Sequence, residues 1–355
     1  MTPHVLVTGG SGFLGSHLVR ELATRGRGVR VLDRVRPHDP VPGVDYVLGD
    51  VTDPDTVARA LDGVDTVFHL AAKAGLWASD PGAFERVNGA ACRTVFGACE
   101  RRGVSRVVHC STEAVFKSRR RGRVPRNRPI DEDLRLRLDD MVGPYARGKF
   151  IAEQEALAAA ERGLHVVIVN PTIPLGPGDW NLTPPARMLL GFLNGRHPAY
   201  LEGVFNFVDA RDVALGHIAA AERGRPGQRY LLAGHDLRMS EFLALVESLT
   251  GLPMPRLRVP YAVAVGAALG SEALARLTGR RPASPLTGVR LARDPNTFSN
   301  RRAREKLGVT FRPLAETVRD AVAWYAERGL LKRRPHRTPL VRAERTVQGR
   351  PAPGR

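Results

Sequence analysis

Short apolar runs alternate with longer stretches of helical spacing over the first half of the chain. The runs have the length and the bounding turn residues of buried strands, and the stretches between them carry apolar residues on one face. Strands are predicted over residues 4–8, 29–33, 46–48, 66–71, 106–111 and 165–170. Helices are predicted over residues 16–24, 54–61, 81–101 and 145–161. This alternation predicts an α/β fold built on a doubly wound parallel sheet of the Rossmann type.

The chain changes in texture after Pro171, where turns rich in proline and glycine begin. We expect a Rossmann domain over residues 1–170, with 204–235 returning to it through strands at 204–208 and 229–232. A smaller mixed α/β substrate-binding lobe is expected over 171–203 and 236–330. Helices are predicted over 209–222, over 241–249 with Ser240 as its N-cap and Gly251 as its end, and over 313–328. Residues 331–355 are basic and poor in apolar side chains, which predicts a disordered tail.

The composition, with 43% hydrophobic and 25% charged residues, is that of a globular protein. The longest apolar stretch, residues 259–270, is too short to cross a bilayer, and the first residues lack the pattern of a signal peptide. Three cysteines, Cys92, Cys99 and Cys110, form no CxxC pair, which fits a reducing compartment. A cytoplasmic location is therefore expected.

The formal net charge of +18 is large enough to suggest an anionic partner. Of the 54 basic residues, however, only five are lysine, a skew toward arginine that a coding bias would produce without any binding role. We favour that explanation, and nucleic acid is not expected as a partner.

The segment from Thr8 to Gly15, TGGSGFLG, follows a predicted strand and opens a predicted helix. Gly9, Gly12 and Gly15 would allow a tight turn, close approach of the backbone to a pyrophosphate and close packing of the helix on the strand. The phosphates would lie at the start of the helix, at Phe13 and Leu14, where unpaired N–H groups favour anions. The segment predicts a dinucleotide-binding loop.

Asp33 ends the second predicted strand, where an acidic side chain can bind the adenosine ribose. A carboxylate there favours NAD over NADP, but Arg34 and Arg36 follow it, and an arginine at this point accommodates a 2′-phosphate. NAD is therefore the expected cofactor, with NADP possible. Asp50 and Val51 follow the third strand, where they would contact the adenine edge or only form a turn.

Tyr145 and Lys149 lie one helical turn apart, so both side chains leave the predicted helix on one face. A phenol is a poor base at neutral pH, and a fixed cation beside it stabilises the phenolate. Ser111 and Thr112, at the end of the fifth strand, would supply a hydroxyl donor in the same cleft. A YxxxK pair alone also occurs on solvated helices, but together with the glycine loop it predicts an acid–base centre.

These motifs resemble, in order and spacing, the extended short-chain dehydrogenase/reductases, over about residues 4–330. The resemblance rests on the glycine loop, the Asp50 segment, the run His69 to Ala72, Asn88, Ser111 with Thr112, Tyr145 with Lys149, and the run Asn170 to Thr172. Segments 143–150, 170–179 and 192–196 look like the hopanoid-associated sugar epimerase group of the NAD-dependent epimerase/dehydratase family.

The resemblance implies that Tyr145 is the acid–base group, that Lys149 binds the nicotinamide ribose and lowers the pKa of Tyr145, and that Thr112 orients the substrate oxygen. Ser111 would line the cofactor or replace Thr112. The other residues implied to line the cofactor are Leu70, Ala71, Ala72, Asn88, Asn170 and Thr172, the last two also facing the substrate. Asn206, Asp209 and Arg211 would link the lobes, or only cap a helix, with Asn206 also a substrate candidate. No metal is implied, and relatives often dimerise through helices like 81–101 and 145–161.

Several reactions remain open at this point. An epimerase and a ketoreductase use the same groups, and the Asn170 to Asp179 region also resembles dihydroflavonol reductases and 3β-hydroxysteroid dehydrogenases, whose substrates are apolar. Related dehydratases carry two acids after the threonine, whereas here Glu113, a tentative substrate residue or an exposed loop acid, is followed by Ala114. A non-enzymatic, cofactor-sensing scaffold would be expected to lose Tyr145 or Lys149.

Two further segments carry open interpretations. Residues 261–277 are apolar and nearly uncharged, which suits a buried core helix best, and otherwise a wall over an apolar substrate or a lipid-facing surface. A basic segment between Thr112 and Tyr145 would attract a diphosphate, an acyl carrier or an anionic lipid surface, or would be a solvated loop. Its basic residues are Lys117, Arg119, Arg120, Arg121, Arg123, Arg126 and Arg128.

Overall fold

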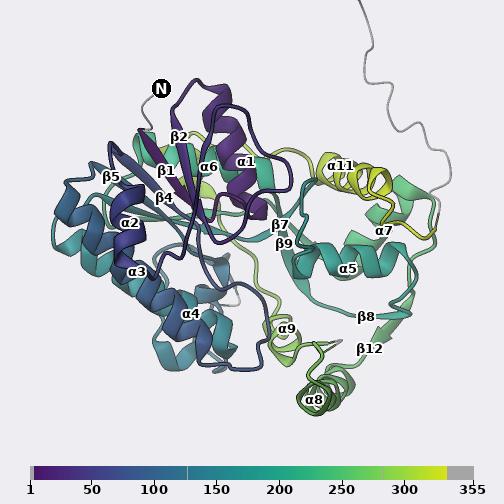
Figure 1. The fold of residues 1–355 in the computed structure, drawn as a ribbon. Coiled ribbons are helices and arrows are strands. Elements are labelled where there is room, and N and C mark those ends of the chain that lie inside the picture. Colours follow the sequence, from purple (N-terminus) through teal and green to yellow (C-terminus); the bar gives the residue numbers. More distant parts are fainter. Residues whose placement is uncertain (1–3, 126, 283, 334–355) are drawn as a thin grey trace, which may run out of the picture.

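The computed structural model describes residues 4–125, 127–282 and 284–333. Its centre is a seven-stranded parallel sheet in the order β10-β6-β5-β4-β1-β2-β3 (Figure 1). The strands are β1 (Val5–Thr8), β2 (Val29–Asp33), β3 (Asp45–Leu48), β4 (Thr66–His69), β5 (Arg106–Cys110), β6 (Val166–Pro171) and β10 (Arg229–Leu232). The predicted doubly wound α/β sheet is confirmed, with strand bounds within one or two residues of those expected.

Helices cover both faces of this sheet (Figure 1). One face carries α1 (Phe13–Thr24), α6 (Ala210–Arg223) and α10 (Arg301–Leu307), and the other carries α2 (Pro54–Ala60), α3 (Ala83–Arg102) and α4 (Gly143–Glu161). Val5 and Val7 of β1 pack into the first core and Leu6 into the second, all at most 1% exposed. A strand buried on both faces must be apolar along its length, which is why these runs were recognisable.

A second lobe follows β6. It holds a three-stranded sheet in the order β11-β9-β7 and a parallel pair, β8 with β12. Its strands are β7 (Ile173–Leu175), β8 (Ala199–Leu201), β9 (Val204–Asp209), β11 (His235–Arg238) and β12 (Leu257–Val259). Its helices are α5 (Pro184–Leu193), α7 (Met239–Thr250), α8 (Tyr261–Thr278), α9 (Leu286–Leu291) and α11 (Leu314–Glu327). Two short 3-10 helices, η1 (Glu113–Phe116) and η2 (Leu138–Asp140), precede α4.

Two sequence-based expectations need correction here. The strand expected at 204–208 to rejoin the main sheet, β9, pairs instead with β7 and β11, and only β10 returns to β6. Helix α7 begins at Met239 rather than after Ser240, because the Glu241 carboxylate accepts the N–H of Arg238 at 2.7 Å. Gly251, with φ of 67°, ends α7 as expected. The proposed lobe boundaries remain a prediction, and residues 334–355 of the predicted tail lie outside the described residues.

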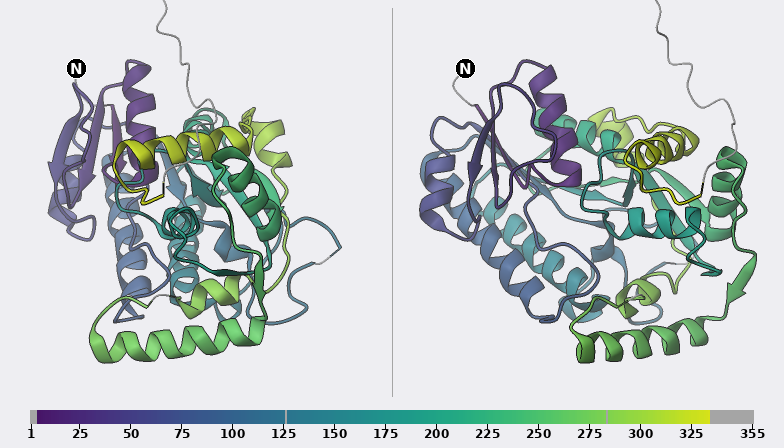
Figure 2. Two further views of the ribbon diagram at one scale, coloured as in Figure 1. Left: turned by 90° about the vertical axis from the view of Figure 1, so that its right-hand side faces the viewer. Right: turned by 45° about the vertical axis from the view of Figure 1, so that its right-hand side comes forward.

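Helix α8 lies at the periphery of the described structure, away from the main sheet (Figure 2). Only Ala268 and Ala275 are buried on it, whereas Leu274 is 61% and Leu277 is 86% exposed. The preferred interpretation of this segment as a buried core helix was therefore wrong. Among the described residues no helix is both long enough and apolar enough to span a membrane.

Candidate active site

The loop between β1 and α1 lies at the carboxyl end of the main sheet and has no room for a side chain at Gly9 or Gly15. Gly9 has φ of 73°, and a Cβ there would lie 2.7 Å from the backbone nitrogen of Ala71. A Cβ on Gly15 would lie 2.1 Å from the carbonyl oxygen of Gly9. No side chain caps α1 at Gly12, and the hydroxyl of Ser11 is buried without a partner among the described residues. These N–H groups and this hydroxyl are donors suited to a pyrophosphate.

Asp33 holds this loop from the neighbouring strand. Its Oδ2 accepts the N–H of Ser11 at 3.0 Å, which places the carboxylate beside the loop, where a ribose would lie. Arg34 is 76% exposed and lies 4.0 Å from the carboxylate of Asp50. Asp50 accepts the N–H and hydroxyl of Thr52, and these bonds lower its pKa. The geometry of Asp50 is thus that of a turn-forming acid, and the donor set around Asp33 fits a dinucleotide.

The loop after β4 packs directly against the glycine loop. Ala71 donates its N–H to the hydroxyl of Thr8 at 3.3 Å, and it is the backbone of Leu70 and Ala71 that excludes a side chain at Gly9. Asn88 accepts the N–H of Lys73 at 2.7 Å and so fixes this loop from α3. Ala72 lies within the same loop. The residues predicted to line a cofactor here are brought together, with Asn88 behind them.

Tyr145, Thr112 and Glu113 lie together beyond the end of β5. The Thr112 hydroxyl donates to Glu113 Oε2 at 2.8 Å. Burial, followed by the charge of Glu113, raises the pKa of Tyr145 above its ordinary range, although Thr112 lowers it. The arrangement places a phenol near a hydroxyl that is itself bound to a carboxylate.

Lys149 is 5% exposed, and its ammonium donates to the Cys110 carbonyl at 2.6 Å. That Lys149 lowers the pKa of Tyr145 stays a prediction; in this structure burial and the charge of Glu113 raise that pKa. Lys149 lies one turn beyond Tyr145 on the same helix, as its spacing predicted.

A buried network that the sequence did not reveal lies behind Tyr145 and Thr112. Glu153 of α4 accepts the Ser111 hydroxyl at 2.5 Å and the Asn170 amide at 2.8 Å, and it pairs with Arg229 at 3.3 Å. Burial raises the pKa of Glu153. The Ser111 hydroxyl and the Asn170 amide are therefore committed to Glu153, which leaves Thr112 as the hydroxyl that meets Tyr145. Only the spacing of Glu153, one turn after Lys149, could have drawn attention to it.

Thr172 and Asn206 join the end of β6 to the second lobe. The Thr172 hydroxyl donates to Asn206 Oδ1 at 2.7 Å, and the Asn206 amide donates to Asp236 at 2.8 Å. Asp209 both caps α6 through the N–H of Arg211 and binds its guanidinium, which also lies 2.6 Å from Asp320 of α11. Both interpretations of this segment, a helix cap and a link to the second lobe, are thus present.

Glu113 and Lys117 are buried rather than exposed. Glu113 is 9% and Lys117 is 5% exposed, so neither belongs to a solvated loop. The Lys117 ammonium donates to the Leu291 carbonyl at 3.3 Å and lies 5.8 Å from the centre of the Phe298 ring. The arginines from Arg119 to Arg128 that the structure describes are exposed, and Arg126 lies outside the described residues.

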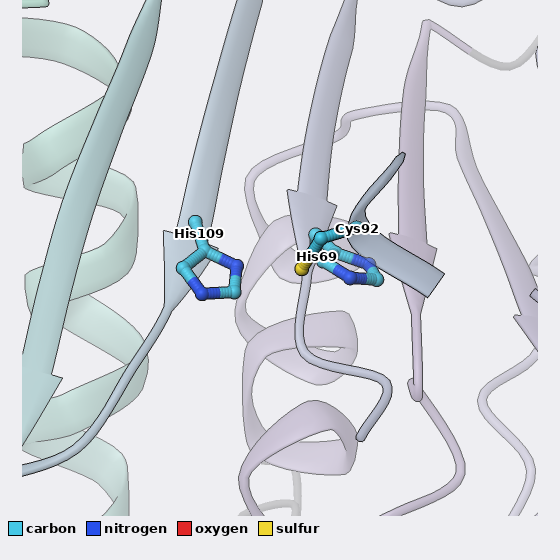
Figure 3. Close-up of side chains that lie close together, drawn as sticks. All are labelled: His69, Cys92 and His109. Atoms are coloured by element: carbon cyan, nitrogen blue, oxygen red, sulfur yellow. The ribbon is translucent and has the colours of Figure 1, made fainter. Parts of the chain in front are cut away.

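Two histidine rings, His69 and His109, lie at the ends of neighbouring strands with Cys92 beside them (Figure 3). Their nitrogen and sulfur atoms lie within 4.8 Å of one another, and all three residues are buried. Burial lowers the pKa of His69 to about 3 and raises the pKa of Cys92 to about 12. Because the Lys149 ammonium also acts on all three, a cation would be repelled here, and we assign these side chains to the core.

Comparison with known proteins finds one family and several relatives that match most of this chain. Residues 5–233 match the model of the NAD dependent epimerase/dehydratase family. A putative dihydroflavonol 4-reductase of Synechocystis sp. is 34% identical, covering 92% of this chain and 95% of its own length. Sterol demethylase protein B of Methylococcus capsulatus is 33% identical, covering 92% of this chain and 99% of its own. The crystal structure of gox2253 is 35% identical with a TM-score of 0.79, covering 92% of this chain and 99% of that one.

Gly15→Ala should weaken binding of NADH by at least about 10-fold, because a methyl group 2.1 Å from the Gly9 carbonyl must push the loop away from the phosphates. The dissociation constant is measured by quenching of NADH fluorescence. Gly97→Ala on α3, where the nearest atom is the Arg101 guanidinium at 3.4 Å, is the matched control. Equal affinity of the two variants would contradict the assignment of the loop.

The stability of the fold should fall on mild acidification. His69, His109 and His217 are buried, and burial lowers the pKa of each, to about 3 for His69 and about 4 for His217. A group whose pKa is depressed in the folded state contributes stability above its unfolded pKa, near 6.5, and this is lost as the pH falls. From about pH 7.5 to about pH 5.5 each should cost about 1.4 kcal/mol, or about 4 kcal/mol together.

Urea titrations over this pH interval measure the loss in the free energy of unfolding. His109→Phe should remove about 1.4 kcal/mol of the pH dependence. His4→Gln changes an exposed histidine and should leave it intact. A stability independent of pH over this interval would show that these rings are protonated in the fold.

Proposed function

Because the chain belongs to the NAD dependent epimerase/dehydratase family, a family of NAD(P)-dependent enzymes, we propose that it interconverts a ketone and a secondary alcohol. The single observation that carries this proposal is the placement of Tyr145 and Lys149 on α4 beside Thr112 at the carboxyl end of the sheet. Tyr145 would exchange a proton with the substrate oxygen, and Thr112 would orient that oxygen. Retention of both Tyr145 and Lys149 speaks against a scaffold without activity.

NAD, when bound, would supply or accept hydride at its nicotinamide ring. Gly9, Gly12, Gly15 and the start of α1, Phe13 and Leu14, would hold its pyrophosphate, and Asp33 its adenosine ribose. The contact from Asp33 to the loop supports NAD over NADP, because a carboxylate repels a 2′-phosphate. The remaining residues proposed to line the cofactor are Arg34, Asp50, Val51, Leu70, Ala71, Ala72, Asn88, Lys149, Asn170 and Thr172.

We propose an apolar substrate of the kind that dihydroflavonol reductases and sterol-modifying enzymes handle. The support is that a putative dihydroflavonol 4-reductase and a sterol demethylase protein match nearly the whole chain. Epimerisation of a sugar is the second candidate, and it is supported by membership of the NAD dependent epimerase/dehydratase family. Dehydration is disfavoured, because the second acid it needs is replaced by Ala114.

Tyr145→Phe should lower kcat by about 10²- to 10⁴-fold, because the ring remains but the exchangeable proton is lost. The assay follows NADH or NADPH absorbance against cyclic ketones, including 2-tetralone and a 3-ketosteroid, beside epimerisation of nucleoside-diphosphate sugars. Binding of NADH should be unchanged. Tyr325→Phe, which removes a buried hydroxyl without a partner among the described residues, is the matched control.

Unchanged turnover by the Tyr145 variant would exclude this mechanism. Epimerisation without consumption of NADH would select the second candidate. Absence of both activities, with NADH still bound, would favour a cofactor-sensing protein.

We also propose that the chain forms a homodimer through the outer faces of α3 and α4, on the basis of its resemblance to family members alone. A cytoplasmic location is supported by three free, buried cysteines, which suit a reducing compartment.

Anionic lipid is proposed as a weak partner of the basic segment. A cavity of about 450 Å³ is lined by Val142, Tyr261 and four arginines, Arg119, Arg120, Arg290 and Arg293. Arginine binds phosphate oxygens well, and the exposed leucines of α8 would provide apolar contact with a membrane surface.

Replacement of Arg119, Arg120 and Arg290 by alanine should weaken the affinity of the protein for phosphatidylglycerol vesicles by about 100-fold, measured by sedimentation over a series of lipid concentrations, since each basic residue near such a surface contributes about 1 kcal/mol. Arg93→Ala, on α3, serves as the control. Binding that is equally strong to neutral phosphatidylcholine vesicles, or insensitive to salt, would contradict the electrostatic part of this proposal.

A further inference from the structure

Helix α4 presents three polar side chains to the end of β5, each about one turn after the last. They are Tyr145, Lys149 and Glu153, spaced four residues apart. The chemistry proposed above uses the first two and leaves Glu153 without a role. We propose that Glu153 is a positioning residue, which sets the place of Thr112 relative to Tyr145. This inference rests on the proposed function, because it concerns the two groups that would meet the substrate oxygen.

Glu153 is bound to the residue before Thr112 and, through Asn170, to the backbone of Thr112 itself. Its Oε2 accepts the Ser111 hydroxyl at 2.5 Å. The same oxygen accepts the Asn170 amide at 2.8 Å, and that amide nitrogen also donates to the Thr112 carbonyl at 3.2 Å. Thr112 therefore cannot move away from the sheet without stretching a hydrogen bond that leads to this carboxylate.

The helix converts these bonds into a fixed spacing between phenol and hydroxyl. Lys149, midway between Tyr145 and Glu153, donates to the Cys110 carbonyl at 2.6 Å and so holds the same strand end at a second point. Because all three side chains leave one continuous helix, whatever is bound to Glu153 keeps its place relative to the phenol. A misplacement of about 1 Å between reacting groups can cost about 100-fold in rate.

Arg229 of β10 anchors the carboxylate from the other side. Its Nη1 lies 3.3 Å from Glu153 Oε1, the oxygen that the bonds to the strand end do not use. The same guanidinium lies 4.8 Å from the centre of the Phe116 ring, at the end of η1. Thr112 is the N-cap of η1. The ion pair therefore contacts the chain both before and after Thr112, which restrains this residue from two sides.

A purely structural role of the ion pair is the competing explanation, and Glu132 allows the two to be separated. Its carboxylate is 2% exposed, accepts the N–H of Leu231 at 2.8 Å and lies 3.6 Å from Arg302. Within the described part of the chain its side chain has no hydrogen bond or ion pair with residues 110–112. Glu132 thus resembles Glu153 in burial, hydrogen bonding and arginine partner, but not in contact with Thr112.

Glu153→Leu tests this role, because leucine fills much of the space but accepts no hydrogen bond. For the ketone that the wild type reduces fastest, kcat should fall about 100-fold, with NADH affinity unchanged. Glu132→Leu should lower the free energy of unfolding similarly in urea titrations, because it also breaks a buried pair, but should leave kcat within about 2-fold. Glu153→Gln, which keeps an acceptor oxygen for Ser111 and Asn170, should recover at least about 10-fold of the lost rate.

A second substitution at Thr112 distinguishes positioning from a general loss of structure. Thr112→Val removes the hydroxyl and keeps the shape of the side chain. If Glu153 acts through Thr112, adding Glu153→Leu to Thr112→Val should lower kcat by at most about a further 3-fold, since the hydroxyl that it positions is gone. Two independent effects would multiply, and Glu153→Leu would again cost about 100-fold.

A measurement without substrate separates this inference from the proposed function. The Ala114 N–H donates to the Thr112 hydroxyl at 3.3 Å, so its exchange with deuterium reports how firmly Thr112 is held. Exchange of this amide should be about 10-fold faster in Glu153→Leu than in Glu132→Leu. If the wild type reduces no ketone, the proposed function fails, and this comparison still decides whether Glu153 holds Thr112.

Three results would overturn the inference: a wild-type kcat in Glu153→Leu, full multiplication of its effect with that of Thr112→Val, or equal exchange of the Ala114 amide in the two leucine variants. If Glu153→Leu does not fold, Glu153→Asp takes its place, because it keeps the charge and withdraws the carboxylate by one methylene group. Its kcat should fall about 10-fold, and this fall should vanish beside Thr112→Val. A fall that persists there would count against Glu153 as a positioning residue.

Discussion

The burial of the main sheet on both faces is the constraint from which the rest of this molecule follows. Strands without a polar face can carry polar side chains only where they end, and in a parallel sheet these ends lie along one edge. Asp33, His69, Thr112 and Asn170 all stand at or just beyond such ends. Chemistry is concentrated at this edge because the remainder of each strand offers no place for it.

Polar groups at that edge are costly unless each has a partner, and Glu153 supplies several. It joins Ser111 at the end of β5 to Asn170 of β6 and to Arg229 of β10. Removing one member of such a buried pair typically costs about 3–5 kcal/mol, so β5, β6 and β10 are held firmly in register. The adjacent hydroxyls consequently differ in partner: Ser111 donates to Glu153, and Thr112 donates to Glu113.

The sequence predicted the central fold well because periodicity and glycine spacing are local properties. The strands from β1 to β6, the glycine loop with Asp33, and the pairing of Tyr145 with Lys149 could all be read within short windows, and the resemblance to the epimerase/dehydratase family is confirmed. The features that the sequence did not predict depend on partners that are far away in the sequence. Glu153 meets Arg229 across 76 positions, and β9 was misplaced because strand pairing is decided by the neighbours available in the second lobe.

The prediction of a buried helix α8 and the interpretation of Glu113 as an exposed acid failed for a further reason, because composition does not determine exposure. An apolar helix usually indicates a core, but α8 has too few neighbours to be covered, and the exposed side chains of Leu274 and Leu277 follow from that. An exposed loop acid was one of two interpretations of Glu113, the other being a substrate residue. Glu113 is 9% exposed at the start of η1, and this burial is not visible from the type of residue.

The raised pKa of Tyr145 bears on the direction in which this site works most readily. Burial and the Glu113 charge both disfavour the phenolate, so the side chain is a neutral phenol at physiological pH. A neutral phenol is ready to donate, and the alkoxide that forms when hydride adds to a ketone is a far stronger base than a phenolate. Donation is therefore favourable despite the high pKa. Removing a proton from an alcohol would first require the phenol to lose its own proton, and the charge of Glu113 opposes that step.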